Sequence, residues 1–282
     1  MNKIALVTGT STGLGISIAI QLAKKGFKVF ATMRNMDKQS SLQEAAKDAG
    51  VSLEIRPLDV QDMSSIEQCV AEIIQQEGHI DVLVNNAGAG FVRTTEQATE
   101  AEIQWVMDVN FMGVVRCTKA IIPHMREAKS GHIINISSVG GLVGQPFNEI
   151  YCAAKFAVEG YTESMASYIQ PSFNINFTVV EPAGIRTEFA NSALQQFQST
   201  GGMKDDEYQP ILAKYIGGAQ SRSEGIYQTS DQVADVVIQC IENPNPPVRI
   251  RTSTWSEEFC NLKTQADPTG KLLQEMVTKT FL

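Results

Sequence analysis

Two hydrophobic periodicities alternate through the first half of the chain, and this alternation limits the possible folds more than any other feature. Apolar, β-branched runs occur at residues 3–9, 28–34, 53–60 and 80–88. Amphipathic stretches that end in glycine separate them, at residues 14–26, 41–50 and 65–78. A glycine just past such a stretch is typical of a helix end. Nearly continuous apolar strands that alternate with helices predict an α/β fold, a parallel sheet covered by helices on both faces.

The second half continues the pattern and brings the expected number of strands to about seven. Helices are predicted over 101–128, 151–169 and 230–244, and strands over 132–138, 175–182 and 247–252. No stretch resembles an interdomain linker, so residues 1–282 are expected to form one domain.

Two segments depart from the regular alternation. Residues 186–229 are the least regular and contain the pairs Gly201–Gly202 and Gly217–Gly218, which predicts a substrate lid. Residues 253–282 form a C-terminal extension whose last twelve residues, "KLLQEMVTKTFL", could make an amphipathic helix. Docking of that helix onto its own domain is favoured over contact with a membrane.

Composition excludes several classes of function. The net charge of −8 and the pI of about 5.0 give no electrostatic footprint for nucleic acid. The N-terminus lacks a signal-peptide pattern, and no run of about 18 apolar residues predicts a membrane span, so a cytoplasmic protein is expected. The five cysteines form no CxxC pair and predict reduced thiols. The three histidines lack metal-ligand spacing, so no metal site is expected.

A glycine-rich turn follows the first predicted strand. The segment "TGTSTGLG" places Gly9, Gly13 and Gly15 between this strand and the first helix. Such a turn lets the backbone approach a diphosphate and points helix amides at it. The spacing is neither Walker A nor GxGxxG, and a tight turn without a ligand is the alternative. The position after a buried strand favours a dinucleotide site that also includes Ser11, Thr12 and Leu14.

The end of the second strand bears on the choice of dinucleotide. NAD-binding folds commonly place a carboxylate there for the ribose 2′-hydroxyl, whereas this chain has Met33 followed by Arg34. An arginine can bind a 2′-phosphate through two hydrogen bonds. The sequence therefore favours NADP(H) over NAD(H), and a merely solvated Arg34 is the alternative.

Two further strand ends contribute candidate cofactor contacts. Asp59 and Val60 end the third strand, where Asp59 could reach the adenine edge or equally cap the following helix. The segment "NNAG" ends the fourth strand and supplies Asn86, Ala87 and Gly88. In open parallel sheets the ligand crevice lies outside these carboxyl ends.

Tyr151 and Lys155 stand four residues apart and therefore share one face of a predicted helix. At neutral pH only about one phenol in a thousand is ionised. An ammonium about 4 Å away stabilises the phenolate by about 4 kcal/mol at an effective dielectric of about 20. This matches what an acid–base group working near neutral pH requires. Alone, the pair could equally be a surface contact of little energetic value.

Two polar residues strengthen the catalytic interpretation. Ser138 ends the strand over 132–138, at the same sheet edge, and its hydroxyl could hold a substrate oxygen. Asn110 lies inside a long predicted helix, where asparagine is unfavourable. It could tie a water into a proton relay, or it could mark a local kink.

Together these motifs resemble the short-chain dehydrogenase/reductase family in its compact, single-domain form. The resemblance rests on "TGTSTGLG", "NNAG", Asn110, the Ser138–Tyr151–Lys155 spacing and "EPAGIRT" at 181–187. It implies a Rossmann-type sheet and hydride transfer between NAD(P) and a carbonyl or hydroxyl carbon. It implies that Tyr151 is the acid–base, that Lys155 tunes it and binds the nicotinamide ribose, that Ser138 orients substrate and that Asn110 organises the relay. It also places around the nicotinamide Pro182, Gly184, Ile185 and Thr187.

The segments "ATMRN", 138–166 and "ADPTG" are similar to the branch of this family that contains type 1 17β-hydroxysteroid dehydrogenase and the photoreceptor retinol dehydrogenase. That likeness implies NADP(H), a bulky hydrophobic hydroxyl or keto substrate, and a homodimer or homotetramer formed through the two long helices. The steroid enzyme uses a histidine in its substrate loop, but this chain has none after His132, which argues against oestrogen-like substrates. Possible substitutes are Tyr208, Tyr215 and Tyr227.

The leading prediction is an NADP(H)-dependent oxidoreductase. One alternative is a non-catalytic NADP(H)-sensing protein on the same fold, although such a sensor has no need of Ser138, Tyr151 and Lys155 together. Another is an epimerase or dehydratase with a tightly held cofactor, which the short chain and the absence of an evident C-terminal substrate domain disfavour.

Overall fold

The sheet confirms the predicted doubly wound α/β class and its number of strands. The computed structural model describes residues 3–281, and the side chains of that range other than those of 219–225 and 281. Seven parallel strands pair in the order β3-β2-β1-β4-β5-β6-β7. They are β1 (Ile4–Thr8), β2 (Lys28–Met33), β3 (Glu54–Pro57), β4 (Val82–Asn85), β5 (Gly131–Ile136), β6 (Ile175–Glu181) and β7 (Arg249–Arg251).

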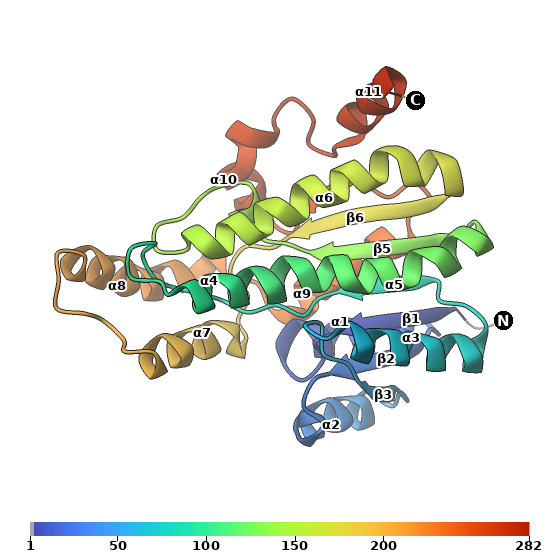
Figure 1. The fold of residues 1–282 in the computed structure, drawn as a ribbon, viewed down its shortest axis with the longest axis horizontal. Helices are drawn as coiled ribbons and strands as arrows, with labels where there is room; N and C mark the ends of the chain where they lie inside the picture. Colours follow the sequence, from blue (N-terminus) through green and yellow to red (C-terminus); the bar gives the residue numbers. More distant parts are fainter. Residues whose placement is uncertain (1–2, 282) are drawn as a thin grey trace.

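Helices cover both faces of this sheet, as Figure 1 shows. On one face the apolar core includes side chains of α1 (Gly13–Lys24), α2 (Ser40–Ala49) and α9 (Ser230–Glu242). On the other it includes side chains of α3 (Met63–Glu77), α5 (Gly113–Ala128) and α6 (Glu149–Phe173). Because both faces of the sheet are buried, the strands are apolar on both sides, and this explains the continuous runs in the sequence. Short 3₁₀ turns, η1 (Met36–Lys38) and η3 (Val139–Gly141), follow β2 and β5.

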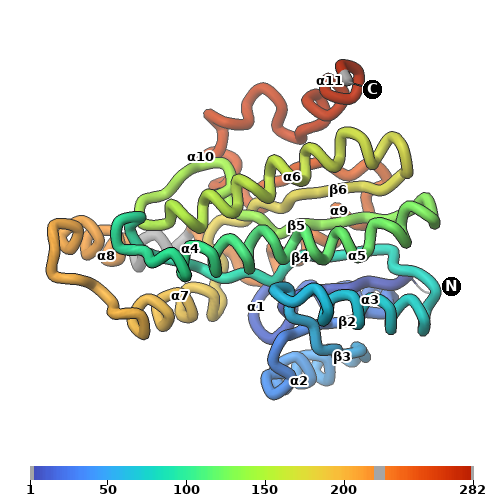
Figure 2. The backbone as a smooth tube through the Cα atoms, viewed as in Figure 1, coloured from blue at the N-terminus to red at the C-terminus, as the bar shows by residue number. Residues whose placement is uncertain are grey.

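The strand order reverses between β1 and β4. The loop after β1 leads to α1 on one face of the sheet, and the loop after β4 leads towards α5 on the other face. Such a reversal at the carboxyl edge leaves a crevice for a ligand. Figure 2 shows the chain beyond this edge continuing into α7 (Glu188–Ser199) and α8 (Gln209–Ile226), which lie past the ends of the strands.

The helix predicted over 101–128 is interrupted. It consists of α4 (Glu100–Met107), a π-helical turn η2 (Asp108–Met112) and α5. The turn contains Asn110, whose side-chain amide donates to the carbonyl of Val106 (3.0 Å). A π-helical turn is a local departure from the α-helical ladder and often occurs at functional sites. The local distortion raised as one interpretation of Asn110 is therefore present.

The prediction that residues 186–229 are irregular was wrong. Two helices, α7 and α8, occupy most of this segment, and the turn between them contains Gly201 and Gly202 at φ +105° and +61°. Thr187 begins α7 with a side-chain cap, since its Oγ1 accepts from the amide of Phe189 (3.2 Å). Gly217 and Gly218 lie within α8. The pair Gly201–Gly202 thus lies in a turn, as glycine favours, whereas packing of α8 over the cavity outweighs the roughly 1 kcal/mol per residue that Gly217 and Gly218 cost in a helix.

The C-terminal extension forms α10 (Thr254–Thr264) and α11 (Lys271–Phe281). Helix α11 docks onto α6, where Gln274 donates to the carbonyl of Ala166 (2.8 Å) and Thr278 donates to that of Ser167. The expected docking of the terminal helix onto its own domain is thus observed. Residue 282 of the extension, and the side chains 219–225 of the predicted lid, lie outside the described residues.

Three further findings concern the described part of the chain. No helix in it combines the length and hydropathy needed to cross a membrane. Within the same residues no group of three His, Cys, Asp or Glu side chains is arranged to hold a metal ion. The five cysteines are buried and free.

Candidate active site

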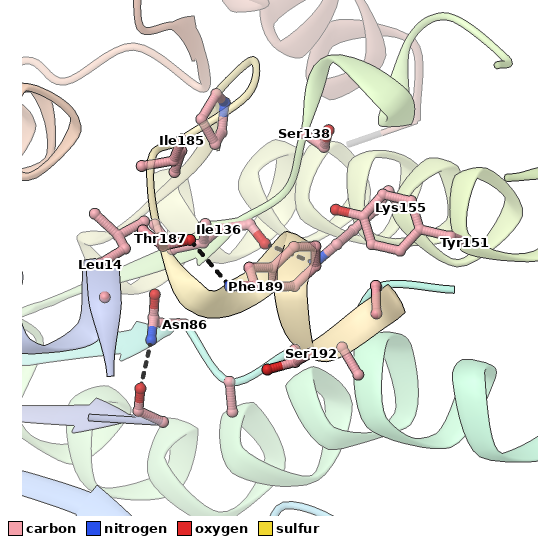
Figure 3. A pocket seen from close by; sticks show the side chains of 18 of the residues that line it. Leu14, Asn86, Ile136, Ser138, Tyr151, Lys155, Ile185, Thr187, Phe189 and Ser192 are labelled. Carbon is pink, nitrogen blue, oxygen red and sulfur yellow. Dashed lines mark hydrogen bonds between the residues drawn. The ribbon is translucent and has the colours of Figure 1, made fainter. Parts of the chain in front are cut away.

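A single cavity of about 830 Å³ opens at the carboxyl edge of the sheet. It brings together the predicted site residues, with the exception of Asn110. The predicted residues that line it are Gly9, Ser11, Thr12, Gly13, Leu14, Gly15, Arg34, Asp59, Val60, Asn86, Ala87, Gly88, Ser138, Tyr151, Lys155, Pro182, Gly184, Ile185 and Thr187. Figure 3 shows Ser138, Tyr151 and Lys155 on one side of the cavity, with Leu14 and Asn86 across from them.

The glycine turn between β1 and α1 is shaped for close backbone approach. Gly9 and Gly13 have φ values of +71° and +56°, which side-chain-bearing residues rarely adopt. A Cβ on Gly15 would lie 2.3 Å from the carbonyl oxygen of Gly9. Thr12, the N-cap of α1, makes no side-chain cap, and the first turn has no acidic residue. The amides at the start of α1 therefore remain available to an anionic group.

Two residues hold the glycine turn against the end of β4. Asn86 donates from Nδ2 to the carbonyls of Thr8 (2.9 Å) and Gly9 (3.0 Å). The buried Oγ1 of Thr8 accepts from the amides of Asn86 and Ala87, both at 3.0 Å. Thr8 was not predicted as a site residue. Its place directly before the glycine turn, as a polar residue ending a buried strand, was the available signal.

Arg34 and Asp59 line the same end of the cavity as the glycine turn, which we call the nucleotide end. Arg34 is exposed, and its Nη1 reaches Gln61 Oε1 at 3.4 Å, a weak contact that leaves most of the guanidinium for solvent or a ligand. Asp59 does not cap α3, because the N-cap of that helix is Asp62. Instead Asp59 Oδ1 accepts from the amide of Gln61 (3.0 Å) and shapes the loop around the cavity. The helix-cap interpretation of Asp59 was therefore wrong.

Tyr151 sits in the first turn of α6, with Ser138 across from it. Its ring packs edge-on against Phe189 of α7, with centroids 6.1 Å apart. Burial raises the pKa of Tyr151 to about 12, against a smaller lowering by the hydroxyl of Ser138. The sequence predicts a lowered pKa for this phenol, and the structure gives the opposite direction. The reason is the desolvation cost of the phenolate among the side chains of α6 and α7, although Tyr151 is partly exposed to the cavity.

Lys155 follows one turn later on the same helix face. Its Nζ lies 5.7 Å from the centroid of the Tyr151 ring and donates to the carbonyl of Ile136 at the end of β5 (3.0 Å). Burial lowers the pKa of Lys155 to about 8, and an ionised Glu159 would raise it. The ammonium is thus the larger population at pH 7, about tenfold over the amine. Ile136 was not predicted, and a backbone carbonyl leaves no signal in the sequence.

Asn110 is fully buried behind the "NNAG" loop rather than in the cavity wall. Its side chain pairs with the backbone of Ala89 in both directions, accepting from the amide (3.1 Å) and donating to the carbonyl (2.9 Å). A Cβ on Gly88 would lie 3.0 Å from Asn110 Oδ1 and 3.6 Å from Lys155 Nζ. Asn110 therefore supports the loop between the cofactor end of the cavity and Lys155.

The other end of the cavity is mainly apolar and aromatic. Trp255 and Phe259 of α10 are stacked, with centroids 4.7 Å apart and planes 13° from parallel, and both line the cavity. From α7 come Phe189, Ser192, Ala193 and Gln196. Helix α10 was not predicted as a source of site residues, although the i, i+4 spacing of these two aromatics places them on one helix face.

The three candidate tyrosines differ in position. Tyr215 and Tyr227 line the cavity, whereas Tyr208 does not and donates its hydroxyl to Glu96 (2.7 Å). The hydroxyl of Tyr215 accepts from Asn148 Nδ2 (2.7 Å). A Cβ on Gly184 would lie 2.1 Å from the Tyr227 ring, so this glycine is required for the tyrosine to pack there.

Comparison with known proteins agrees with this geometry. The family model described as short chain dehydrogenase matches residues 3–198. Retinol dehydrogenase 8 of Bos taurus is 39% identical over 276 residues, which covers 96% of this chain and 87% of that protein. The 17-beta-hydroxysteroid dehydrogenase type 1 of Mus musculus is 34% identical over 274 residues, 95% of this chain and 78% of that protein.

A solved structure gives the same result for the fold. A variant of actinorhodin polyketide ketoreductase with NADPH superposes with a TM-score of 0.78 at 27% identity, over 92% of this chain and 98% of that one. The match to the family model and the identity to full-length relatives together establish that this chain belongs to the short-chain dehydrogenase family, as a nicotinamide-dependent oxidoreductase of alcohol and keto groups.

Proposed function

We propose that the protein is an NADP(H)-dependent oxidoreductase of bulky, hydrophobic hydroxyl or keto compounds. The observation that carries the proposal is the convergence of Ser138, Tyr151 and Lys155 on one cavity of about 830 Å³, with the glycine turn at one end and an aromatic wall at the other. The volume lies in the upper part of the range for small-molecule sites.

The residues present fit a dinucleotide. Gly9 and Gly13 adopt backbone conformations that suit close approach, and the uncapped start of α1 offers amides to a diphosphate. When bound, the nicotinamide would supply or accept the hydride. Asp59, Val60, Asn86, Ala87 and Gly88 would surround the nucleoside and ribose, and the segment 182–187 would lie at the nicotinamide.

Arg34 supports the choice of NADP(H). It is the cation at the end of β2, its guanidinium is exposed, and its neighbour Met33 is buried and carries no charge that would repel a phosphate. A guanidinium can hold a ribose 2′-phosphate through paired hydrogen bonds. The ketoreductase whose structure is similar also contains NADPH.

The proton chemistry belongs to Tyr151. With a pKa of about 12 the phenol is protonated at pH 7, as a proton donor to a carbonyl oxygen must be. In reduction, Tyr151 gives its proton to the substrate oxygen while Ser138 holds that oxygen by a hydrogen bond, and Lys155 stabilises the phenolate that forms. In oxidation the same proton moves in reverse. Asn110, held against Ala89, would keep the path from Lys155 to solvent in place.

The substrate end favours an elongated apolar compound. Trp255, Phe259 and Phe189 give flat apolar contacts, while Asn148 and Tyr215 place a polar pair in the wall. The relatives described above are named for a retinoid alcohol and a steroid, which are bulky and largely apolar. We propose that the segment 186–229, with α7 and α8, acts as a lid over this end.

Two proposals concern the protein's context. The free, buried cysteines support a reducing, cytoplasmic location. The family resemblance supports a homodimer or homotetramer through the helices over 101–128 and 151–169. Sedimentation of the purified protein measures its oligomeric state.

The decisive test is oxidation of NADPH and NADH by the pure protein with retinal, keto-steroids and small carbonyls, alongside Tyr151→Phe. Turnover that prefers NADPH, and that falls by about 10²–10⁴ in the variant while NADPH binding persists, is expected. Turnover with NADH alone would contradict the role of Arg34. Cofactor binding that is equal in both proteins, without turnover in either for any carbonyl, would favour the sensing function.

A further inference from the structure

A buried carboxyl group lies directly behind the catalytic residues. Glu159 is one helical turn beyond Lys155 and two beyond Tyr151, so the three side chains share one face of α6. Only 5% of Glu159 is exposed. A carboxyl group this deep requires hydrogen-bond donors or a cation if it is to carry a charge.

Glu159 also packs under the turn that carries Ser138. A Cβ on Gly141, in that turn, would lie 2.7 Å from Glu159 Oε1 and 2.6 Å from Ser137 Oγ. The two oxygens therefore converge on one point below the turn. A third group, Glu181 at the end of β6, is fully buried and lies close enough to raise the pKa of Glu159.

The hydrogen-bond pattern of this group is incomplete. Among the described residues, Ser137 Oγ, both carboxyl oxygens of Glu159 and Glu181 Oε1 make no hydrogen bond of normal geometry. The Ser137 hydroxyl can donate to one oxygen of Glu159 in either protonation state, and a proton on the other oxygen of Glu159 lets the acid donate to Glu181 Oε1. The partner atoms that such a proton needs are thus already present.

The cationic side chains near Glu159 contact groups other than its carboxyl oxygens. The guanidinium of Arg251 contacts Glu181 Oε2 (3.2 Å) and Glu257 (2.9 Å). The guanidinium of Arg249 contacts Glu163 (2.6 Å). Lys155 donates to the Ile136 carbonyl. The charged and titratable groups around Glu159 are Lys155 and Glu163 on α6, Glu181 on β6, Arg249 and Arg251 on β7, and Glu257 and Cys260 on α10.

We propose that Glu159 is a positioning residue that remains a neutral acid in the working enzyme, sharing one proton with Glu181 beneath Lys155 and the Ser138 turn. Arg251, which also contacts Glu257, lies against Glu181 and favours the single negative charge of the pair on that carboxyl. Burial raises the pKa of Glu181 to about 7, and Arg251 opposes this rise. Burial, and then the neighbouring Glu181, raise the pKa of Glu159 well above its usual range, in agreement with this arrangement.

The consequence concerns Lys155, and it rests on the proposed role of Tyr151 and Lys155 in proton transfer. An ionised Glu159 on the same helix face would compete with Tyr151 for the ammonium. A neutral Glu159 leaves the field of Lys155 directed at the phenol. It also lets the acid hold the Ser137–Gly141 turn by hydrogen bonds.

The first measurement is the infrared spectrum of the full-length wild-type protein at about pH 8, where ordinary carboxyl groups are ionised. A stretching band of a buried, protonated carboxyl group is expected, and Glu159→Gln should remove it. Glu163→Gln, one turn further along α6, is the matched control and should leave it. A spectrum without this band, or a band that survives Glu159→Gln, would overturn the proposal. Because this readout needs no turnover, it is independent of the test with Tyr151→Phe.

The second measurement is the pH dependence of kcat/KM. Glutamine resembles the neutral acid in shape and charge. Glu159→Gln should therefore keep kcat/KM within about twofold and should not shift the pH at which the plot of kcat/KM against pH has its inflection. Glu159→Leu, which cannot bond Ser137 or Glu181, should lose at least about tenfold. If Glu159 were ionised, the Gln variant would lower the inflection by about two pH units, as expected for loss of a charge roughly 6 Å away at an effective dielectric of about 20. That shift would contradict the proposal.

Discussion

The two ends of the cavity are built in different ways. The nucleotide end consists of short turns that leave buried parallel strands, and bonds from Thr8 and Asn86 tie these turns together. The substrate end consists of three helices outside the sheet, α7, α8 and α10. Several of their large apolar side chains are partly exposed, such as Phe189 at 43% and Phe259 at 38%.

The two ends differ in construction because binding a dinucleotide and binding a particular substrate make different demands on the backbone. The nucleotide end must place backbone amides within fractions of an ångström of where a diphosphate binds, and a buried sheet fixes them well. The substrate end must match one shape, and helices joined by exposed turns can change without disturbing the sheet. Substitutions at the two ends should therefore have different kinetic consequences.

The largest effect is expected at the glycine turn. In Gly15→Ala the new methyl group would lie 2.3 Å from the Gly9 carbonyl and 2.7 Å from Asn86 Nδ2, so the turn must shift. We expect NADPH affinity to fall by about a hundredfold, from roughly 2–3 kcal/mol of overpacking. Titration calorimetry measures it. Gly160→Ala, on α6 with open space around it, is the control and should leave affinity unchanged. Equal losses in both variants would contradict the assignment.

Acid sensitivity is also expected in the sheet, at the buried His132 of β5. Burial lowers the pKa of His132 from 6.5 to about 3, and its Nε2 lies 2.9 Å from Thr178 Oγ1. Below about pH 6.5 this histidine is protonated in the unfolded chain, whereas in the folded chain it is protonated only near pH 3. The free energy of unfolding therefore decreases as the pH falls through this window.

The test of this acid sensitivity is His132→Gln. The loss between about pH 6.5 and about pH 4.5 should be smaller in the variant by about 2–3 kcal/mol. Urea unfolding at both pH values measures the difference, with His124→Gln as control. An unchanged pH dependence in His132→Gln would show that His132 is charged in the folded protein.

At the substrate end the expected effect is on KM. Trp255→Ala removes one ring of the stacked pair and part of the aromatic wall. KM for a bulky carbonyl should rise about thirtyfold, or about 2 kcal/mol, with kcat changed much less. Leu262→Ala on the same helix, at a side chain 90% exposed, should leave KM unaltered. A fall in NADPH affinity in Trp255→Ala would break the separation between the two ends.

The smallest effect is expected at Arg34, because its side chain is exposed and screened by solvent. Arg34→Ser should reduce the preference for NADPH over NADH by about tenfold, chiefly through the KM of NADPH. Steady-state kinetics with both cofactors measure this ratio. Lys38→Ser, in the following turn, is the control. An unchanged ratio in Arg34→Ser would place the 2′-phosphate elsewhere.

Much of the nucleotide end could be predicted because its signals are local. Glycines at positive φ, small residues at a strand end and a four-residue spacing on a helix each reflect contacts made within a few residues. The parallel sheet then brings such strand ends to one edge whatever the side chains between them. This is why the predicted residues other than Asn110, from Gly9 to Thr187, meet in one cavity.

Other features depended on packing between distant segments. Residues 186–229 contain glycine pairs that locally favour a loop, yet α7 and α8 form there and bury Phe197 and Leu212 against Phe147. Likewise α10, more than a hundred residues after Tyr151, supplies Trp255 and Phe259 to the same cavity. A pattern along the chain does not report which helix faces which cavity.

The sequence by itself determined the α/β class, the order of its elements and the candidate catalytic residues, because periodicity and short motifs are properties of neighbouring residues. The tertiary structure alone decided the environments of those residues. Burial raises the pKa of Tyr151 and lowers that of Lys155, and both buried carboxyl oxygens of Glu159 lack a hydrogen bond among the described residues. Desolvation depends on every atom that excludes water from a site, and those atoms come from segments far apart in the chain.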